Sequence, residues 1–245
     1  MKMDIGGMSI VGLGIYVEKI SSLVISDLHL GYEEVLEKQG ISLPQSQYPK
    51  MRKEIERMVK ETNPRKLIIN GDIKHEFSGA QRQEWNEITD LISYLKDAKT
   101  EMVAIRGNHD NYIIPILKKN GVELRDSYLE QGYCFTHGHS EITTDAETII
   151  IGNDHPAISF RDELGVKLKF KCLLDGNVGG KRVIVLPAFS PLMPGSEINR
   201  MANNDFLSPL LKTAPIGSFT VYVIEQGVGA YKFGKLGKIR EMGIL

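Results

Sequence analysis

The sequence predicts an α/β fold of two packed sheets flanked by helices, in one domain that spans residues 1–245. Three observations support this expectation. First, 245 residues with 42% apolar and 25% charged side chains suit one large globular domain. Second, short apolar runs alternate with amphipathic helical patterns in the first half of the chain. Third, strand-like runs with little helix between them follow residue 165, which predicts a second, more antiparallel sheet.

The first half of the chain repeats a strand, a polar loop and a helix. Apolar runs predict strands over residues 23–25, 67–69, 102–105, 133–136 and 148–151. Amphipathic stripes predict one helix over 47–62 and a second through 85–95, which Ser78 and Gln81 would begin as a capping box. Each strand ends at a polar motif, and open α/β sheets bind ligands beyond the carboxyl ends of their strands. We therefore expect these motifs to meet at one edge of a sheet.

The second half of the chain is predicted to be rich in strands. The apolar runs lie at residues 166–174, 182–186, 219–224 and 230–233. The last residues, 234–245, contain glycine and lysine, and we expect them to be loosely held. The sequence contains no linker, internal repeat or low-complexity tract, which agrees with a single domain.

Composition and charge argue against several classes of protein. The net charge of −1 offers no general surface for nucleic acid or membranes, so extended nucleic-acid binding is not expected and any attraction for phosphate must be local. Cys134 and Cys172 lie in apolar segments without metal-ligand spacing, which predicts buried thiols in a reducing cytosol. Residues 1–19 lack a signal-peptide core, and no window approaches about 18 apolar residues. We therefore expect a soluble, cytoplasmic protein with no membrane partner.

All 6 histidines lie in short polar motifs, beside glycine, aspartate or asparagine. The motifs are Ser26-Asp27-Leu28-His29, Asn70-Gly71-Asp72-Ile73-Lys74-His75, Arg106-Gly107-Asn108-His109-Asp110, Thr136-His137-Gly138-His139 and Gly152-Asn153-Asp154-His155. Histidine, carboxylate and amide oxygen are the ligands of divalent metals such as manganese, iron and zinc. The sequence therefore predicts a metal site assembled from separate loops, with hydrolytic chemistry.

The residue types in these motifs suit a pair of metal ions. Two cations about 3.5–4 Å apart can hold both the attacking and the leaving oxygen of a phosphoryl transfer, and they share a bridging carboxylate. Asp27 and His29 are alternate residues at a strand end, so extended backbone would turn both toward one site. A preceding glycine permits the tight turn that brings Asp72 to a strand tip. Asn108 offers an amide oxygen, and the adjacent His109 could reach a leaving group as general acid.

In order and spacing, the motifs resemble the calcineurin-like metallophosphoesterase superfamily. The matching residues between 26 and 156 are Asp27-x-His29, Gly71-Asp72, Gly107-Asn108-His109-Asp110, His137 and Gly152-Asn153-Asp154-His155. As a set they are specific, although each motif alone would be weak. Four further stretches are similar to archaeal phosphoesterases and to metallophosphoesterases associated with bacterial DNA ligases: Gly71-Asp72-Ile73-Lys74-His75, His137-Gly138-His139, His155-Pro156-Ala157 and Leu186-Pro187-Ala188-Phe189.

The resemblance implies a metallophosphoesterase fold with a binuclear metal centre. It assigns one metal to Asp27, His29, Asp72 and His155, and the other to Asp72, Asn108, His137 and the position of Asn153. Asp72 would bridge the two ions, and a bridging hydroxide would attack phosphorus in line. His109 would then protonate the leaving alkoxide or stabilise charge on the phosphate oxygens.

One position departs from the family pattern. The fifth motif of the family is usually Gly-His-x-His, and Asn153 stands where the first histidine normally binds the second metal. An asparagine oxygen suits a transition ion less well than imidazole does. Three outcomes are open: Asn153 binds the metal directly, His139 or Asp154 replaces it, or the second site is only partly filled. We favour a working but weakened second site.

Several polar residues have both a functional and a structural interpretation. Asp110 is expected to orient His109, with a loop-capping role as the alternative. His75 either lines the substrate pocket or bonds a metal ligand from outside, and His139 has similar alternatives. Arg106 and Arg161 are candidate phosphate contacts, although surface or ion-pair roles are more common for arginine.

The sequence thus predicts a metal-dependent phosphoesterase, preferably a phosphodiesterase, that acts on a small-molecule or nucleotide phosphoester. The expected cofactors are two divalent ions, with Mn²⁺ favoured and Fe, Zn, Ni or Mg as alternatives. The rival hypothesis is a catalytically weak or inactive metallophosphoesterase fold that serves as a binding or scaffold module. Asn153 alone supports this rival, and the presence of His109 argues against it, because a scaffold needs no general acid.

Overall fold

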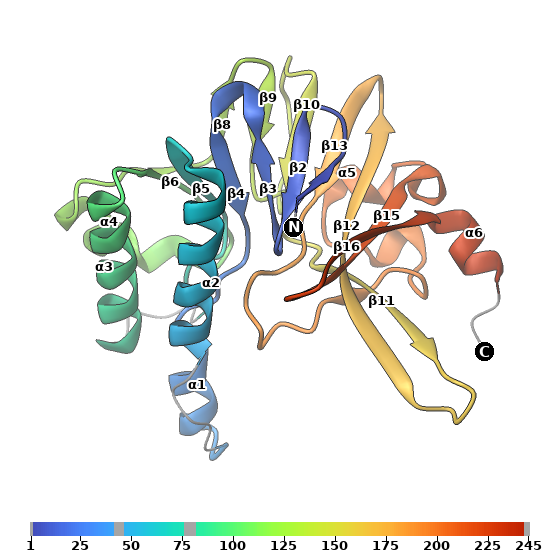
Figure 1. Cartoon of the computed structure of the whole chain (residues 1–245), viewed down its shortest axis with the longest axis horizontal. Coiled ribbons are helices and arrows are strands. Elements are labelled where there is room, and N and C mark those ends of the chain that lie inside the picture. The colour runs from blue at the N-terminus through green and yellow to red at the C-terminus, as the bar shows by residue number, and fades with distance from the viewer. Residues whose placement is uncertain (1, 42–46, 76–81, 243–245) are drawn as a thin grey trace.

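The computed structural model describes residues 2–41, 47–75 and 82–242, so the predicted capping box of Ser78 and Gln81 lies outside the described residues. Within these ranges the strands form two sheets with helices on their outer sides, which confirms the predicted two-sheet α/β fold (Figure 1). No helix in the described ranges combines the length and apolar character needed to span a membrane.

The first sheet runs in chain order from β1 to β7. Its strands are β1 (Met3–Asp4), β2 (Met8–Val11), β3 (Gly14–Val17), β4 (Ser22–Ile25), β5 (Lys66–Asn70), β6 (Glu101–Ile105) and β7 (Leu124–Arg125). The strands are antiparallel from β1 to β4 and parallel from β4 to β7. The sequence did not predict β1–β3, because left-handed glycine turns at Gly6, Gly7 and Gly12 divide this segment into runs too short to show a period.

The second sheet mixes parallel and antiparallel pairs, in the order β14-β11-β12-β13-β10-β9-β8, with β15 paired to β12 and β16 to β15. Its strands are β8 (Tyr128–Glu130), β9 (Tyr133–Phe135), β10 (Thr148–Ile151), β11 (Pro156–Arg161), β12 (Lys167–Val178), β13 (Lys181–Val185), β14 (Ser196–Glu197), β15 (Thr220–Glu225) and β16 (Gly229–Lys235). β11 and β12 extend beyond the body of the molecule as a hairpin, at the lower right of Figure 1.

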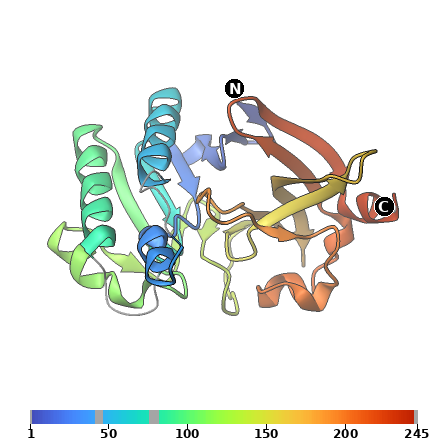
Figure 2. The same ribbon diagram turned by 90° about the horizontal axis from the view of Figure 1, so that it is seen from below.

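Helices cover the outer faces of both sheets. The α-helices are α1 (Tyr32–Lys38), α2 (Gln47–Thr62), α3 (Arg82–Asp97), α4 (Ile114–Lys119), α5 (Pro209–Lys212) and α6 (Leu236–Glu241). Short 3₁₀ helices are η1 (Glu18–Ile20), η2 (Asp110–Tyr112), η3 (Asn203–Asp205) and η4 (Ile216–Ser218). Figure 2 shows α2 and α3 on the side of the first sheet and α5 and α6 on the side of the second.

Two apolar cores account for this layering. The larger core contains the helix stripe of Met51 and Ile55 and also Ile150 of β10, so it joins the first sheet to the second. The smaller core contains Ile149 and Ile151, the neighbours of Ile150, together with residues of α5 and α6. Because successive side chains of a strand point to opposite faces, β10 contributes to both cores. The second sheet is therefore buried on both faces at β10.

The described part of the predicted loose tail, residues 234–242, is folded, contrary to the prediction from its glycine and lysine content. Residues 229–235 form β16 and residues 236–241 form α6. Leu236 and Ile239 are buried in the smaller core, because they lie three positions apart on one face of α6. Cys134 and Cys172 are buried free thiols, as predicted.

The sequence predicted that the polar motifs meet at one edge of one sheet. The structure instead divides them between the two sheets. Three of them follow β4, β5 and β6 of the first sheet, and two follow β9 and β10 of the second. The side chain of Asn70 joins the sheets at this point, where its Nδ2 donates to the carbonyl oxygens of Thr136 (2.9 Å) and Ile150 (3.0 Å). The strand repeat looks the same in sequence for either sheet, so periodicity could not separate them.

Candidate metal centre

The loops that carry the predicted metal ligands adopt backbone conformations that side chains normally avoid. The φ angles of Asp27, His29, Asp72 and His155 are 58°, 46°, 47° and 45°, all in the left-handed region. Such positions are uncommon for residues other than glycine and cluster at functional sites. Asp27 and His29 therefore reach one site through left-handed turns, and not through the extended backbone that their alternate spacing suggested.

The glycines of the motifs make room for ligands from other motifs. A Cβ on Gly71 would lie 2.3 Å from the Cδ2 of His137, and one on Gly107 would lie 2.0 Å from the Oδ1 of Asp72. A Cβ on Gly152 would lie 2.6 Å from the Oδ2 of Asp27. Real Cβ atoms do not approach other heavy atoms so closely, so each glycine is needed to let two loops pack against each other.

The predicted ligands converge on two buried carboxylates. The Oδ1 of Asp27 lies 2.9 Å from the Nε2 of His137 and 3.0 Å from the Nε2 of His155. The Oδ2 of Asp72 lies 3.7 Å from the Nε2 of His137 and 3.9 Å from the Nε2 of His29. Three groups could each hold a cation: Asp27 with His29 and His155, Asp27 with Asp72 and His137, and His29 with His75 and His109. The first two groups share Asp27.

Unpaired polar atoms at this site fit a bound cation. The Oδ2 of Asp27, the Nε2 of His29 and the Oδ1 of Asn108 are buried and have no hydrogen-bond partner within the described residues. Leaving a buried acceptor or donor unpaired costs about 1–3 kcal/mol, so three such atoms in one place are unusual for a purely structural cluster. All three are atoms through which aspartate, histidine and asparagine bind divalent metals.

The carboxylates and imidazoles of the site shift one another's pKa values. Burial alone would raise the pKa of Asp27, but His155 and His137 hold it well below the usual range. Burial alone would lower the pKa of His137 and His155, and the carboxylate of Asp27 outweighs it and raises both. Burial also lowers the pKa of His29 and raises that of Asp72 to about 6. Protons and a cation therefore compete for the same ligand atoms.

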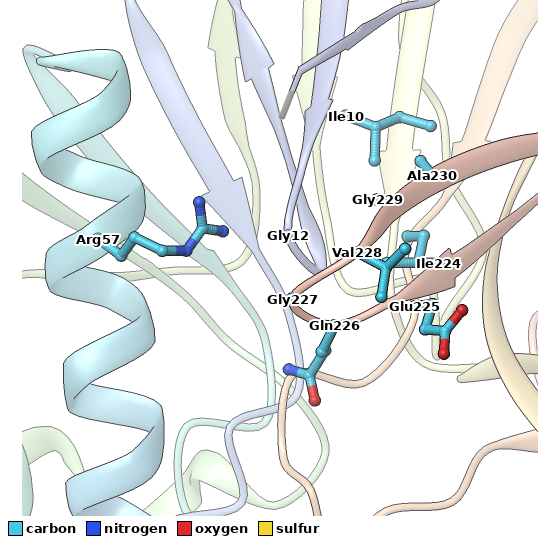
Figure 3. Close-up of a pocket in the computed structure, with 10 residues that line it drawn as sticks. All are labelled: Ile10, Gly12, Arg57, Ile224, Glu225, Gln226, Gly227, Val228, Gly229 and Ala230. Atoms are coloured by element: carbon cyan, nitrogen blue, oxygen red, sulfur yellow. The ribbon is translucent and has the colours of Figure 1, made fainter.

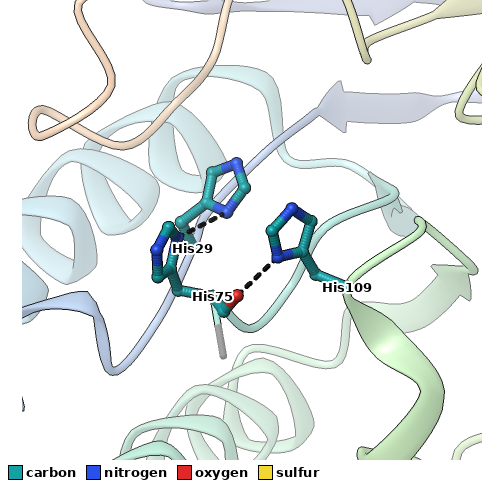
Figure 4. A group of neighbouring side chains, drawn as sticks. All are labelled: His29, His75 and His109. Atoms are coloured by element: carbon teal, nitrogen blue, oxygen red, sulfur yellow. Dashed lines mark hydrogen bonds between the residues drawn. The ribbon is translucent and has the colours of Figure 1, made fainter. Parts of the chain in front are cut away.

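His109 lies at the edge of this cluster with a fixed ring orientation. Its Nδ1–H donates to the carbonyl oxygen of His75, as the dashed line in Figure 4 shows. Its Nε2 lies 3.7 Å from the Oδ2 of Asp72, and its backbone N–H donates to the Oδ1 of Asp72 over 3.0 Å. The carbonyl of His75 thus directs the second ring nitrogen of His109 toward the centre.

Asp110 is fully buried and bonds to the backbone of the neighbouring loops. Its Oδ1 accepts the backbone N–H groups of Ile73 (2.9 Å) and Lys74 (3.2 Å), and its Oδ2 accepts that of Gly107 (2.8 Å). This geometry favours the loop-capping alternative for Asp110. Any orientation of His109 by Asp110 is therefore transmitted through the backbone of these two loops.

The two remaining histidines contact predicted ligands from outside. The Nδ1 of His75 lies 3.3 Å from the Nδ1 of His29, and its ring packs on Tyr32 with 3.7 Å between centroids. The Nδ1 of His139 lies 3.1 Å from the Nδ1 of His137. Each of these contacts leaves the Nε2 of the inner histidine directed at the carboxylates. Both residues thus fit the role of bonding a ligand from outside.

The position of the missing histidine is buried. Asn153 is 7% exposed, and its backbone N–H donates to the carbonyl oxygen of His137 over 3.2 Å. The neighbouring Asp154 is bonded elsewhere, since its Oδ1 accepts the backbone N–H groups of Leu207 (2.6 Å) and Ser208 (3.3 Å). His139 and Asp154 were the two residues considered as substitutes for Asn153 at the metal. His139 lies beside the predicted ligand His137, whereas Asp154 is bonded to the segment before α5.

The candidate phosphate contacts Arg106 and Arg161 bond to other groups. The Nε of Arg106 donates to the Oδ1 of Asp126 over 2.9 Å, and the Nη1 of Arg161 donates to the carbonyl oxygen of Gly165 over 2.7 Å. Both interactions are exposed. These surface bonds agree with the more common role of arginine.

Sequence reasoning missed a partly buried cation beside the centre. The Nζ of Lys171 donates to the carbonyl oxygens of Ala188 (2.7 Å) and Ser190 (2.5 Å), and the N–H of Ser190 donates to the carbonyl oxygen of Asp27 (3.0 Å). Burial lowers the pKa of Lys171 to about 8, although Asp27 partly opposes this. Lysine in a strand usually faces solvent, so its sequence context gave no signal.

A separate hollow lies between the β2–β3 turn, α2 and the β15–β16 turn. Ile10, Gly12, Arg57 and residues 224–230 line it, and Figure 3 shows the guanidinium of Arg57 reaching toward it from α2. The hollow contains none of the predicted site residues. Arg57 is bonded to Glu54 and Glu61 of its own helix. This hollow is therefore distinct from the candidate metal centre.

Comparison with known proteins shows the family to which this chain belongs. The family model for calcineurin-like phosphoesterases matches residues 20–215, and the chain belongs to this family. The chain is similar to the crystal structure of the Pseudomonas putida nuclease MPE, with a TM-score of 0.64 and 18% identity over 91% of this chain and 96% of that one. The structure of Yfce, a phosphoesterase from E. coli, matches with a TM-score of 0.41 and 15% identity over 87% of this chain and 99% of that one. No curated protein sequence matches the chain.

The family and the clustered histidines and aspartates together define a metal-dependent phosphoesterase, a hydrolase that acts on phosphate esters. The likeness to the P. putida structure, at this low identity, concerns the fold alone.

Proposed function

We propose that this chain is a binuclear, Mn²⁺-favouring phosphodiesterase that hydrolyses a nucleotide-type phosphodiester. The observation that carries the proposal is the set of buried, unpaired ligand atoms on Asp27, His29 and Asn108. The Nε2 atoms of His137 and His155 converge on the other carboxylate oxygen of Asp27, its Oδ1. The P. putida structure of similar fold is that of a nuclease, which agrees with a nucleotide-type substrate.

The residues divide between two cations. On the family pattern, Asp27, His29, Asp72 and His155 would hold one ion, and Asp72, Asn108, His137 and Asn153 would hold the other. The geometry differs in one respect, because His137 groups with Asp27 as well as with Asp72. When bound, such ions activate water and neutralise the charge that develops on phosphoryl oxygens. The donor set is mixed nitrogen and oxygen, which suits manganese better than a set of thiolates would.

His109 is the residue that we assign to the leaving group. Because its Nδ1–H is held by the carbonyl of His75, the imidazolium form presents its Nε2–H toward the centre. That proton can pass to the leaving alkoxide as its bond to phosphorus breaks. Asp110 keeps the loops of Gly107 and Ile73 at a fixed separation, so it positions His109 without touching the substrate.

The scaffold hypothesis accounts less well for the same observations. A scaffold has no use for buried donors and acceptors that lack partners, since each lowers stability. It also gives no reason for four left-handed residues at the predicted ligand positions.

The test is hydrolysis of bis-p-nitrophenyl phosphate with added Mn²⁺, beside p-nitrophenyl phosphate as a monoester. We expect metal-dependent turnover of the diester, its loss in Asp72→Asn, and a fall of about 10²–10⁴-fold in His109→Ala. Asp90→Asn changes an exposed aspartate of α3 and should leave turnover unchanged. Metal analysis should give two ions per chain in the parent protein. A parent protein without metal-dependent turnover would favour the scaffold.

A further inference from the structure

The β11–β12 hairpin carries a row of cations on one face. In the antiparallel register Arg161 stands opposite Lys167, and Ala157 stands opposite Lys171. Residues directly opposite each other share a face, and so do alternate residues of one strand. Arg161, Lys167, Lys169 and Lys171 therefore lie on one side of the hairpin, which we call the cationic face. Steps between alternate lysines are about 7 Å.

The inner end of the cationic face lies at the metal centre. β11 begins at Pro156, directly after the predicted ligand His155. Lys171 is joined to Asp27 through Ser190, whose carbonyl accepts from Lys171 and whose N–H donates to the carbonyl of Asp27. From there the row leads outward through Lys169 and Lys167 to the turn. Figure 1 shows this hairpin extending past the rest of the sandwich.

The charge on this face is not balanced by its own carboxylates. Glu197 is the acceptor on the face, and its carboxylate lies 2.5 Å from Lys167, 3.7 Å from Lys169 and 3.6 Å from Arg200. One carboxylate is thus shared by three cations, while Arg161 and Lys171 donate to uncharged backbone carbonyls. Asp162 and Glu163 lie at the outer turn. Even with these two counted, cations outnumber anions on a chain whose net charge is −1.

The cations of the outer half remain accessible while they hold these contacts. The side chains of Lys167 and Lys169 are 44% and 25% exposed. An ammonium group has three N–H donors, so a lysine can keep its bond to Glu197 and still meet an external anion. The opposite face of the hairpin differs in character, because Phe160 packs against Phe233 of β16 with 5.2 Å between ring centroids.

We propose that the cationic face binds the phosphates of a single-stranded nucleic acid and leads the strand to the metal centre. Such a strand carries one negative charge per nucleotide, which a single file of cations can match, and positively charged tracks are how proteins hold single strands. This proposal rests on the proposed phosphodiesterase function and names a polymer as its substrate. It departs from the expectation that extended nucleic-acid binding is absent. That expectation was drawn from the net charge of −1, which does not show the local surplus of positive charge on the hairpin.

The test measures binding and hydrolysis separately. Binding of a fluorescein-labelled single-stranded oligonucleotide of about twenty nucleotides is followed by anisotropy in EDTA, so that no cleavage occurs. The double variant Lys167→Gln/Lys169→Gln should bind roughly tenfold more weakly, with a salt slope lower by about 1.4. Lys167→Arg/Lys169→Arg should retain binding, and so should Lys53→Gln/Lys60→Gln, which removes two exposed lysines of α2.

The outcomes distinguish this proposal from the proposed function. Turnover of bis-p-nitrophenyl phosphate with Mn²⁺ should be the same in the hairpin variant and the parent, because that substrate is too small to reach the hairpin. Equal oligonucleotide binding by the hairpin variant and the α2 variant would overturn the inference even if turnover is normal. Competition by polyglutamate as strong as by unlabelled oligonucleotide would also overturn it, in favour of an acidic protein partner.

Discussion

Gly107→Ala is the most direct test of how closely the loops of the metal centre must pack. An alanine Cβ would lie 2.3 Å from the backbone nitrogen of Asp72 and 2.0 Å from its Oδ1. Ordinary contact begins near 3.5 Å, so the loop of Asp72 must move by about 1 Å. A displacement of this size at a catalytic group costs about 100-fold in rate, or ~2.7 kcal/mol of transition-state stabilisation. Overpacking should lower the free energy of unfolding by about 1–3 kcal/mol.

The assay for this prediction is Mn²⁺-dependent turnover of bis-p-nitrophenyl phosphate, together with urea unfolding of the same samples. Gly217→Ala is the matched control, because a Cβ there meets its nearest heavy atom at 3.6 Å, an ordinary contact distance. The control should change both measurements little. A folded Gly107→Ala protein with turnover within about twofold of the parent would refute the reasoning, because Asp72 would then tolerate the shift.

Two other predictions concern stability. Leu236→Ala should lower the free energy of unfolding by about 2–5 kcal/mol, because Leu236 is buried in the smaller core; a change below 1 kcal/mol would contradict the placement of α6. Burial lowers the pKa of Lys171 to about 8 from 10.5, so the unfolded chain binds more protons between these values. Relative to Lys171→Met, the parent should therefore gain up to about 3 kcal/mol as pH rises from 8 to 10.5 and nothing below 8. Urea unfolding midpoints of both proteins, measured across this pH range, test whether the parent gains stability relative to the variant. The same pH dependence in both proteins would contradict the prediction.

The fold was largely predictable because helix and strand periods differ. The stripe of Met51 and Ile55 and the run at residues 67–69 each show their period clearly, and both elements occur as expected. The assignment of strands to sheets was not predictable in this way. β10 has the same apolar character as β5, and only tertiary contacts such as those of Asn70 show that they belong to different sheets.

The predicted site residues could be recognised because their side chains bind metals. Their neighbours were missed because their contacts involve backbone groups. Asp27 and His29 carry metal-binding atoms that sequence reasoning can weigh. The ammonium of Lys171 bonds to backbone carbonyls, and Ser190 acts through its own backbone N–H and carbonyl. Every residue has these backbone groups, so no residue type signals the contacts. The effect of the left-handed turn at Asp27 was hidden likewise, because aspartate alone does not specify φ.

The placement of the candidate ligands on both sheets has a consequence for the whole molecule. Asp27 and Asp72 come from loops of the first sheet, and His137 and His155 from loops of the second. A cation that binds an aspartate of the first sheet and a histidine of the second would cross-link the two halves of the sandwich. Its binding free energy would add to the free energy of unfolding, by about 2.7 kcal/mol at a hundredfold excess over Kd. Loss of the ion would remove this link between the sheets and lower the free energy needed to open the sandwich at this edge. Hydrogen exchange in the loops of the centre should therefore be slower with the ion bound than without it.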